Sequence, residues 1–126
     1  MSEIRANTVS DAAGTGPVTL TGQYAAKAWM NLNGTGTIAI RDSFNVSSVT
    51  DNGTGAYTQS FTNALLNGNY CTNATGTHDN GSYVSWGTVA NDTPPSTTAF
   101  RGDYLNNAGT LVDVSFAQTS SFGDLA

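Results

Sequence analysis

Two runs of Asn-Gly-Thr-Gly constrain the fold of this chain more than any other feature. They occupy residues 33–36 and 52–55. Asn-Gly is the preferred central pair of a type I′ turn, because both positions of that turn need a positive φ. The segments beside these runs alternate apolar and polar residues, as strands do. We therefore expect each run to join two antiparallel strands in a β-hairpin.

The composition also favours an all-β domain. Thr, Ser, Asn and Gly make up 58 of the 126 residues, and only 10% are charged. This mixture is typical of half-exposed strands that are joined by tight turns. The hydrophobic share of 38% still allows a core, and the length suits one domain. We expect about seven or eight short strands in an antiparallel β-sandwich or barrel-like domain.

Alternation places a first strand at residues 28–32, with Trp29 on one face and three apolar residues on the other, Ala28, Met30 and Leu32. The segment after the first turn has an apolar face of its own, made of Ile38, Ile40, Phe44 and Val46. Asp42 falls on that face by strict counting, which indicates either a partner at an interface or a β-bulge. A second irregularity is expected at Ser47-Ser48, because Val49 is out of phase with Val46.

Further strands are predicted downstream, at residues 70–75, 82–90, 97–105 and 111–117. The last of these has the clearest alternation, with Val112, Val114 and Phe116 on one face. The β-domain is therefore expected to span residues 25–117, followed by a C-terminal tail at 118–126 that is frayed or held at an interface.

Residues 1–24 differ from the rest of the chain. Their larger apolar side chains are isolated among Ala, Thr and Gly, and Pro17 follows a Gly-Thr-Gly run. We expect an extended N-terminal attachment arm that lies against a sister chain or a larger assembly. The expected assembly contacts are Ile4, Val9, Val18 and Leu20 of the arm, together with Trp29.

The ionisable residues give little support to catalysis. Cys71 and His78 are the only residues of their kinds, so neither a Cys-rich metal site nor a His-based triad is expected. The Asp residues mostly occupy turn positions, where they bond to the backbone. We therefore expect that the protein is not an enzyme and that it has no catalytic, cofactor-binding or metal-binding site. The net charge of −5 without a basic patch makes nucleic acid a poor partner, and no segment is apolar enough for membrane insertion.

The aromatic residues leave a binding role open. Several of them could stack on sugars, namely Trp29, Tyr57, Tyr70, Tyr83, Trp86, Phe100 and Tyr104. Candidate recognition residues in the later loops are His78, Asp79, Tyr83 and Trp86. Because Trp29 lies opposite an apolar face, its strand needs a second covering layer, which an oligomer interface would supply.

Residues 26–58 carry a resemblance to a family. The run begins Ala26-Lys27-Ala28-Trp29, includes both Asn-Gly-Thr-Gly turns and ends at Thr58. It resembles a β-module of bacteriophage tail-fibre and other virion-fibre proteins. Residues 4–17 are similar to the segment that precedes this module. The resemblance implies a fibre or surface domain that is usually trimeric.

These expectations combine into a leading hypothesis and two alternatives. The leading one is a bacteriophage virion protein, a short homotrimeric fibre or fibre tip that is attached by its arm and contacts the host surface. Its partners would be its own copies, other tail or capsid proteins and a host surface glycan. It would be made in the host cytoplasm, because residues 1–5 lack the apolar stretch of a signal peptide. The alternatives are a capsid decoration (cement) protein and a carbohydrate-binding module.

Overall fold

The computed structural model describes residues 25–77, 84–89 and 93–126, with residues 84–89 described as backbone alone. These residues form eight strands and no helix. The strands are β1 (Ala28–Asn33), β2 (Ala39–Phe44), β3 (Val46–Asp51), β4 (Ala56–Phe61), β5 (Cys71–Thr77), β6 (Val84–Val89), β7 (Ala99–Leu105) and β8 (Phe116–Phe122). The N-terminal arm expected at residues 1–24 lies outside the described residues.

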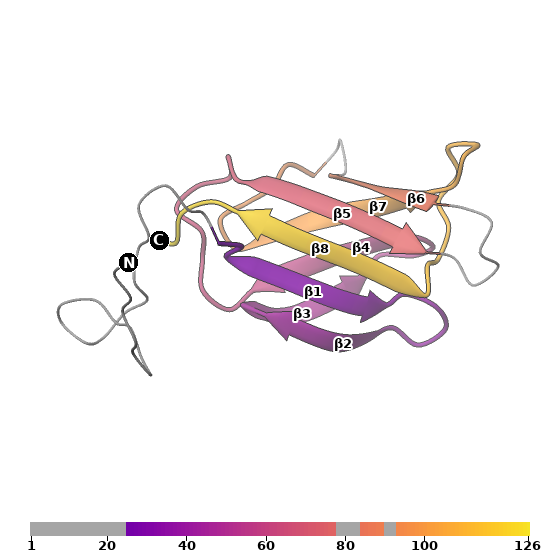
Figure 1. Ribbon diagram of the computed structural model, residues 1–126, viewed down its shortest axis with the longest axis horizontal. Coiled ribbons are helices and arrows are strands. Elements are labelled where there is room, and N and C mark those ends of the chain that lie inside the picture. The colour runs from indigo at the N-terminus through magenta and orange to yellow at the C-terminus, as the bar shows by residue number, and fades with distance from the viewer. Residues whose placement is uncertain (1–24, 78–83, 90–92) are drawn as a thin grey trace, which may run out of the picture.

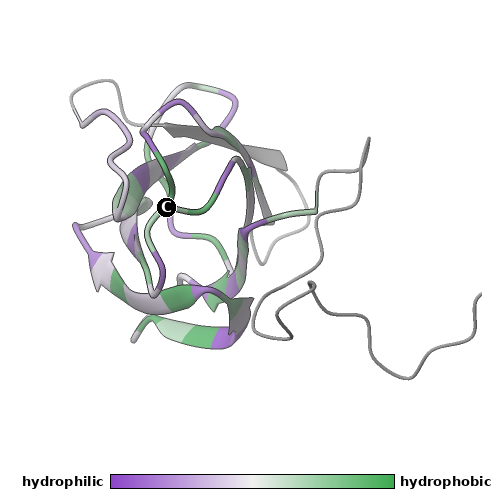
Figure 2. Cartoon of the chain, turned by 90° about the vertical axis from the view of Figure 1, so that its left-hand side faces the viewer, coloured by the Kyte–Doolittle hydropathy of each residue, from purple (hydrophilic) through white to green (hydrophobic). Residues whose placement is uncertain are grey.

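The eight strands belong to one antiparallel sheet, in the order β2-β1-β8-β5-β6-β7-β4-β3. The sheet curls around its core (Figure 2). As a result β2, β1, β8 and β5 form one layer, and β6, β7, β4 and β3 form the other (Figure 1). The expectation of an antiparallel β-sandwich or barrel-like domain is confirmed.

The two edge strands, β2 and β3, follow one another in the chain, and Asn45 is the single residue between them. This residue has a φ of 56°, in the left-handed region that Asn enters more readily than most residues. Its amide nitrogen donates to the carbonyls of Lys27 at 3.0 Å and Asn63 at 3.1 Å. Its Oδ1 accepts the Asn63 N–H at 2.7 Å. These bonds stabilise a corner that leads the chain from one layer to the other.

Both Asn-Gly-Thr-Gly runs join hairpins, as expected, one between β1 and β2 and the other between β3 and β4. The expected type I′ turns are wrong, however. Asn33 is still part of β1, and positive φ values occur at Gly36, Gly53 and Gly55. The Asn33 amide donates to the Thr35 carbonyl at 3.0 Å and accepts from its hydroxyl at 3.0 Å. The side chain of Asn33 thus closes a longer loop, in which a later glycine supplies the positive φ.

A β-bulge at Arg41 explains the position of Asp42. Leu32 pairs with Ile40 and Asn31 pairs with Asp42, so that Arg41 is the extra residue on β2. Of the two explanations that the sequence left open for Asp42, the bulge is confirmed. Asp42 consequently lies on the outward side of the sheet, opposite the core.

The same bulge changes the side of β2 on which Phe44 lies. Phe44 pairs with Trp29, whereas Ile40 pairs with the fully buried Leu32. The expectation that Phe44 shares a face with Ile40 is therefore wrong, because one extra residue inverts the alternation. The irregularity expected in β3 is confirmed by a register shift at Ser47. Bulges on both edge strands disfavour pairing of these edges with another chain.

β8 differs from the strand expected at residues 111–117. It runs between β1 and β5 and includes residues 118–122, which were expected to lie in a C-terminal tail. Its inward residues include Thr119 and Ser121, which are both buried. Because these inward positions are polar, the second half of β8 carries no apolar alternation that could reveal it.

The apolar alternation before β8 belongs to a loop that packs on the core. The Val112 N–H donates to the Tyr104 carbonyl at 3.0 Å, and the Val114 carbonyl accepts the Gly34 N–H at 2.9 Å. The Val114 side chain is fully buried. This segment therefore covers one end of the core and bonds to the end of β7 and to the loop after β1.

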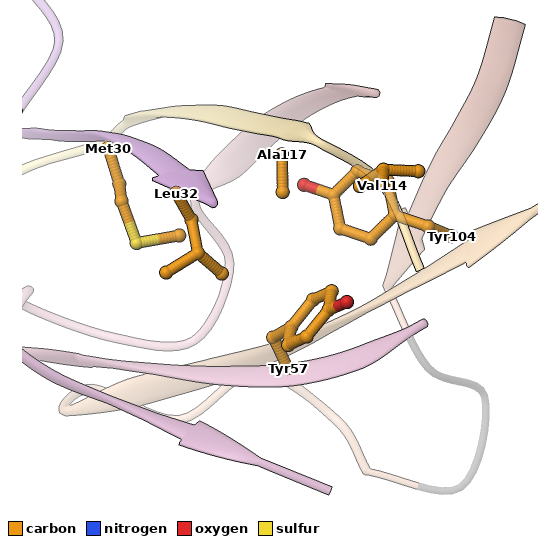
Figure 3. Packing of buried hydrophobic residues seen from close by; sticks show 6 residues of the cluster. All are labelled: Met30, Leu32, Tyr57, Tyr104, Val114 and Ala117. Atoms are coloured by element: carbon orange, nitrogen blue, oxygen red, sulfur yellow. The ribbon is translucent and has the colours of Figure 1, made fainter. Parts of the chain in front are cut away.

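Two clusters of buried side chains fill the space between the layers. The first contains Met30, Leu32, Tyr57, Tyr104, Val114 and Ala117 (Figure 3). The second contains Ala28, Phe61, Leu65 and Phe100. A polar contact also crosses the core, since the Thr119 hydroxyl of β8 donates to Oε1 of Gln59 of β4 at 2.7 Å. The layers are thus held together by apolar packing and by a buried hydrogen bond.

Candidate functional site

The outward surface of the β2-β1-β8-β5 layer is a candidate binding surface. Antiparallel register aligns its side chains in rows that cross the strands. One row contains Phe44, Trp29, Ser120 and Asn73. The next contains Asp42, Asn31, Gln118 and Thr75. We call these two rows, together with Phe116, the aromatic–amide face.

Three large apolar side chains of this face are exposed. Trp29 is 37% exposed, Phe44 is 54% exposed and Phe116 is 42% exposed. Trp29 and Phe44 are direct cross-strand partners, so they form one aromatic pair at one end of the face. Phe116 begins β8 at the other end, one residue beyond the pair of Leu32 with Ala117. The aromatic groups therefore flank the polar row.

Arg41 braces the end of the face that holds Phe116. Its guanidinium carbon lies 4.2 Å from the centre of the Phe116 ring, a cation–π contact. The same guanidinium donates to the carbonyls of Leu32 and Ser115, and to Oδ1 of Asn33 at 3.3 Å. The bulged residue thus fixes the ring of Phe116 and uses much of its own donor capacity within the chain.

The row between the aromatic groups is polar. Asp42, Gln118 and Thr75 are exposed, and Asn31 is half-buried. Oδ1 of Asn31 is buried and has no hydrogen-bond partner among the described residues. A carboxylate, two amides and a hydroxyl therefore lie side by side. The amide oxygen of Asn31 accepts no hydrogen bond from the described residues.

A second cluster lies where the loops of both Asn-Gly-Thr-Gly runs meet. Oδ1 of Asp113 accepts the Gly55 N–H at 2.7 Å and lies 3.1 Å from the Tyr57 hydroxyl. The Tyr57 hydroxyl also donates to the Gly34 carbonyl at 2.7 Å. Burial, aided by the charge of Asp113, raises the pKa of Tyr57 above its usual range. These contacts tie the two loops to each other, which is a structural role.

Several other titratable groups of the described residues are also engaged in structure. Burial raises the pKa of Tyr70 to about 12 and that of Tyr104 above its usual range. Arg101 and Asp103, which belong to an Arg-Gly-Asp sequence, form an ion pair at 3.0 Å on β7. No three His, Cys, Asp or Glu residues in the described ranges lie close enough to share a metal ion.

Most of the sequence-predicted site residues lie outside the described ranges. This holds for the arm contacts Ile4, Val9, Val18 and Leu20, and for the loop residues His78, Asp79 and Tyr83. Trp86 belongs to β6, where its backbone pairs with Thr75, but its side chain is not described. Trp29, expected as an assembly contact, is exposed on the aromatic–amide face.

The structure divides the aromatic residues that could have stacked on sugars. Tyr57, Phe100 and Tyr104 are buried, and Tyr70 packs against the second core cluster. Tyr57, Phe100 and Tyr104 therefore belong to the core and cannot form an exposed platform. Among the described side chains of that set, Trp29 is the one exposed to solvent.

Sequence reasoning missed Phe44, Phe116, Asn31 and Gln118 as members of a surface site. Phe44 could have been placed by applying the Asp42 bulge to the residues that follow it, since the bulge inverts their alternation. The expectation that Phe116 shares a face with Val114 is wrong, because Val114 is buried in the loop before β8 whereas Phe116 begins β8 and is exposed. Gln118 carried no signal, because the polar inward face of β8 hides its register.

No model of a known protein family matches the chain, and no curated protein or solved structure matches it either. Within residues 25–77, 84–89 and 93–126, no helix has the length and apolar character that would cross a membrane.

Proposed function

We propose that this chain is a structural protein of a bacteriophage particle, a short homotrimeric fibre or fibre-tip domain without catalytic activity. Residues 1–24 supply its contacts with sister chains and with the particle. The sequence resemblance of residues 26–58 to virion-fibre modules supports the assignment to a particle.

The proposal depends on one observation: the start of β1 and the C-terminus lie at one end of the domain, and the two Asn-Gly-Thr-Gly loops lie at the other (Figure 1). β1 begins at the same end of the barrel at which the C-terminus lies (Figure 1). At this end the Lys27 N–H donates to the Ser121 carbonyl at 2.8 Å. The loops of the two Asn-Gly-Thr-Gly runs lie at the opposite end. A domain that is attached through one end and projects the other is suited to the tip of a fibre.

The contacts of the ionisable side chains support a non-catalytic role. Asp113 holds two loops together, Arg101 pairs with Asp103, and Arg41 bonds to backbone carbonyls. Groups that are committed to such bonds serve the fold, whereas acid–base catalysis needs convergent groups that can exchange protons with a substrate.

Two measurements test the proposal. Native mass spectrometry or sedimentation equilibrium of the purified full chain should give three times the monomer mass. A stable, folded monomer would refute the trimer. Antibody labelling of the particle should then place the protein on the tail, and labels spread over the capsid would favour the decoration alternative instead.

A further inference from the structure

We infer that the aromatic–amide face binds a neutral oligosaccharide. The inference goes beyond the proposed fibre role, because it assigns a ligand class to one surface of the domain. It also gives Trp29 a ligand-binding role in place of the assembly contact expected from the sequence.

The flanking aromatic groups provide the apolar part of the site. An exposed aromatic ring offers a flat, electron-rich surface, on which the C–H groups of a sugar ring can pack. Trp29 and Phe44 form such a platform, since they are exposed cross-strand partners. Phe116 lies four residues further along the strand direction, roughly 13 Å away at about 3.3 Å per residue. The Arg41 guanidinium lies over one face of its ring and holds the ring in place.

The row between these groups provides hydrogen bonds. Amides present both donors and acceptors, and a carboxylate accepts two hydroxyl groups. Asn31 and Gln118 supply amides, and Asp42 supplies a carboxylate. Because Oδ1 of Asn31 has no internal partner, a rotation of its amide towards the surface would break no hydrogen bond to this oxygen. Alternating hydroxyls of a sugar match such a mixed set better than an apolar peptide does.

Charge and size favour a small neutral ligand. Within the two rows Asp42 is the charged side chain, and the guanidinium of the neighbouring Arg41 is bonded to backbone carbonyls and lies over the Phe116 ring. A polyanion therefore finds no net attraction here. Four strands spaced about 4.8 Å apart, over the 13 Å between the aromatic groups, cover roughly 250 Å². A stable protein interface buries about 800 Å² on each partner, so this face alone is too small for one.

The test uses the purified full chain and a panel of immobilised neutral trisaccharides built from glucose, galactose, mannose or N-acetylglucosamine. A heparin fragment serves as the anionic comparison. We expect saturable binding to at least one neutral member. Trp29→Ala and Asn31→Ala should weaken that binding by roughly tenfold. Leu66→Ala is the matched control, because Leu66 is 58% exposed but lies outside this face. Its binding should equal that of the unchanged chain.

Three outcomes would overturn the inference. These are the absence of binding to every neutral member, binding to heparin alone, and equal binding by the Trp29→Ala and Leu66→Ala variants. Circular dichroism of each variant establishes that it is folded. If Trp29→Ala dissociates the oligomer and leaves sugar binding unchanged, the face is an interface between copies and the inference fails. The oligomer mass and the particle location of the unchanged chain are measured separately, so the proposed function can stand or fall without this site.

Discussion

Removal of one hydroxyl group from Tyr57 should destabilise the domain, although the ring itself stays in place. The Tyr57 hydroxyl donates to the Gly34 carbonyl at 2.7 Å and lies 3.1 Å from Oδ1 of Asp113. In Tyr57→Phe the buried Gly34 carbonyl loses this partner. An unsatisfied buried polar group costs about 1–3 kcal/mol. For a domain of this size each kcal/mol lowers the Tm by about 4 °C, which gives a loss of roughly 4–12 °C.

Tyr104→Phe is the matched control for this loss. The Tyr104 ring lies 5.8 Å from that of Tyr57 in the same cluster, and the Tyr104 hydroxyl is buried without a hydrogen-bond partner among the described residues. Its removal leaves no group unsatisfied and relieves a desolvated hydroxyl. We therefore expect the free energy of unfolding to stay within about 1 kcal/mol of the starting value or to increase.

Thermal and urea unfolding, followed by far-ultraviolet circular dichroism, measure both variants under the same conditions. Tyr57→Phe should lose clearly more stability than Tyr104→Phe. Equal losses would mean that both hydroxyls contribute alike. The assignment of Tyr57 as the bond between the two loops would then be wrong.

Three further predictions concern pH, glycine geometry and the bulge. Burial raises the pKa of Tyr70 from 10.0 to about 12. The neutral side chain therefore contributes its full stability below pH 10, and this contribution is lost as the pH rises through 12. Unfolding measured across this pH range should show the loss of stability, and Tyr70→Phe should make that loss smaller. Gly55→Ala should destabilise far more than Gly36→Ala in urea unfolding. Their φ values are similar, at 67° and 63°, but a Cβ at Gly55 would lie 2.7 Å from backbone atoms of Val112 and one at Gly36 would meet nothing within 4 Å. Arg41→Met should cost about 1 kcal/mol in the same assay, because partly buried hydrogen bonds of a charged donor to the carbonyls of Leu32 and Ser115 are lost.

Local pattern was sufficient for much of the fold and failed where polarity hides the register. The Asn-Gly pairs marked both hairpins, and the misplaced Asp42 and Val49 marked both bulges. The turn type could not be derived, because Asn33 closes its loop through its own side chain. The second half of β8 could not be found, because its inward residues Thr119 and Ser121 carry hydroxyl groups. These hydroxyls bond to Gln59 and Thr72, which are far away along the chain.

The same property explains why the candidate face was recognised only in part. In a chain this rich in Thr, Ser and Asn, polar residues occur on both sides of a strand, so hydropathy cannot separate inward from outward positions. Trp29 was identified because its neighbours Ala28 and Met30 are apolar. Gln118 lies between Ala117 and Thr119, and its orientation follows from pairing with Asn31 and Thr75. Such pairings join segments that are far apart in the chain, and no local pattern reports them.

The structure separates the elements that stabilise the domain from those proposed to bind a ligand. Tyr57 and Asp113 act where the loops meet, on the core side of β4 and on the loop before β8. Trp29 and Gln118 project from the opposite, outward side of β1 and β8. A variant at Tyr57 should therefore lower the Tm and leave sugar affinity unchanged at temperatures where it is folded. A variant at Trp29 should instead weaken sugar binding, and it should leave the contacts of Tyr57 and Asp113 between the loops intact. If Tyr57→Phe weakened sugar binding in its folded state, the face and the loops would be coupled, and the assignment of the site to this face alone would fail.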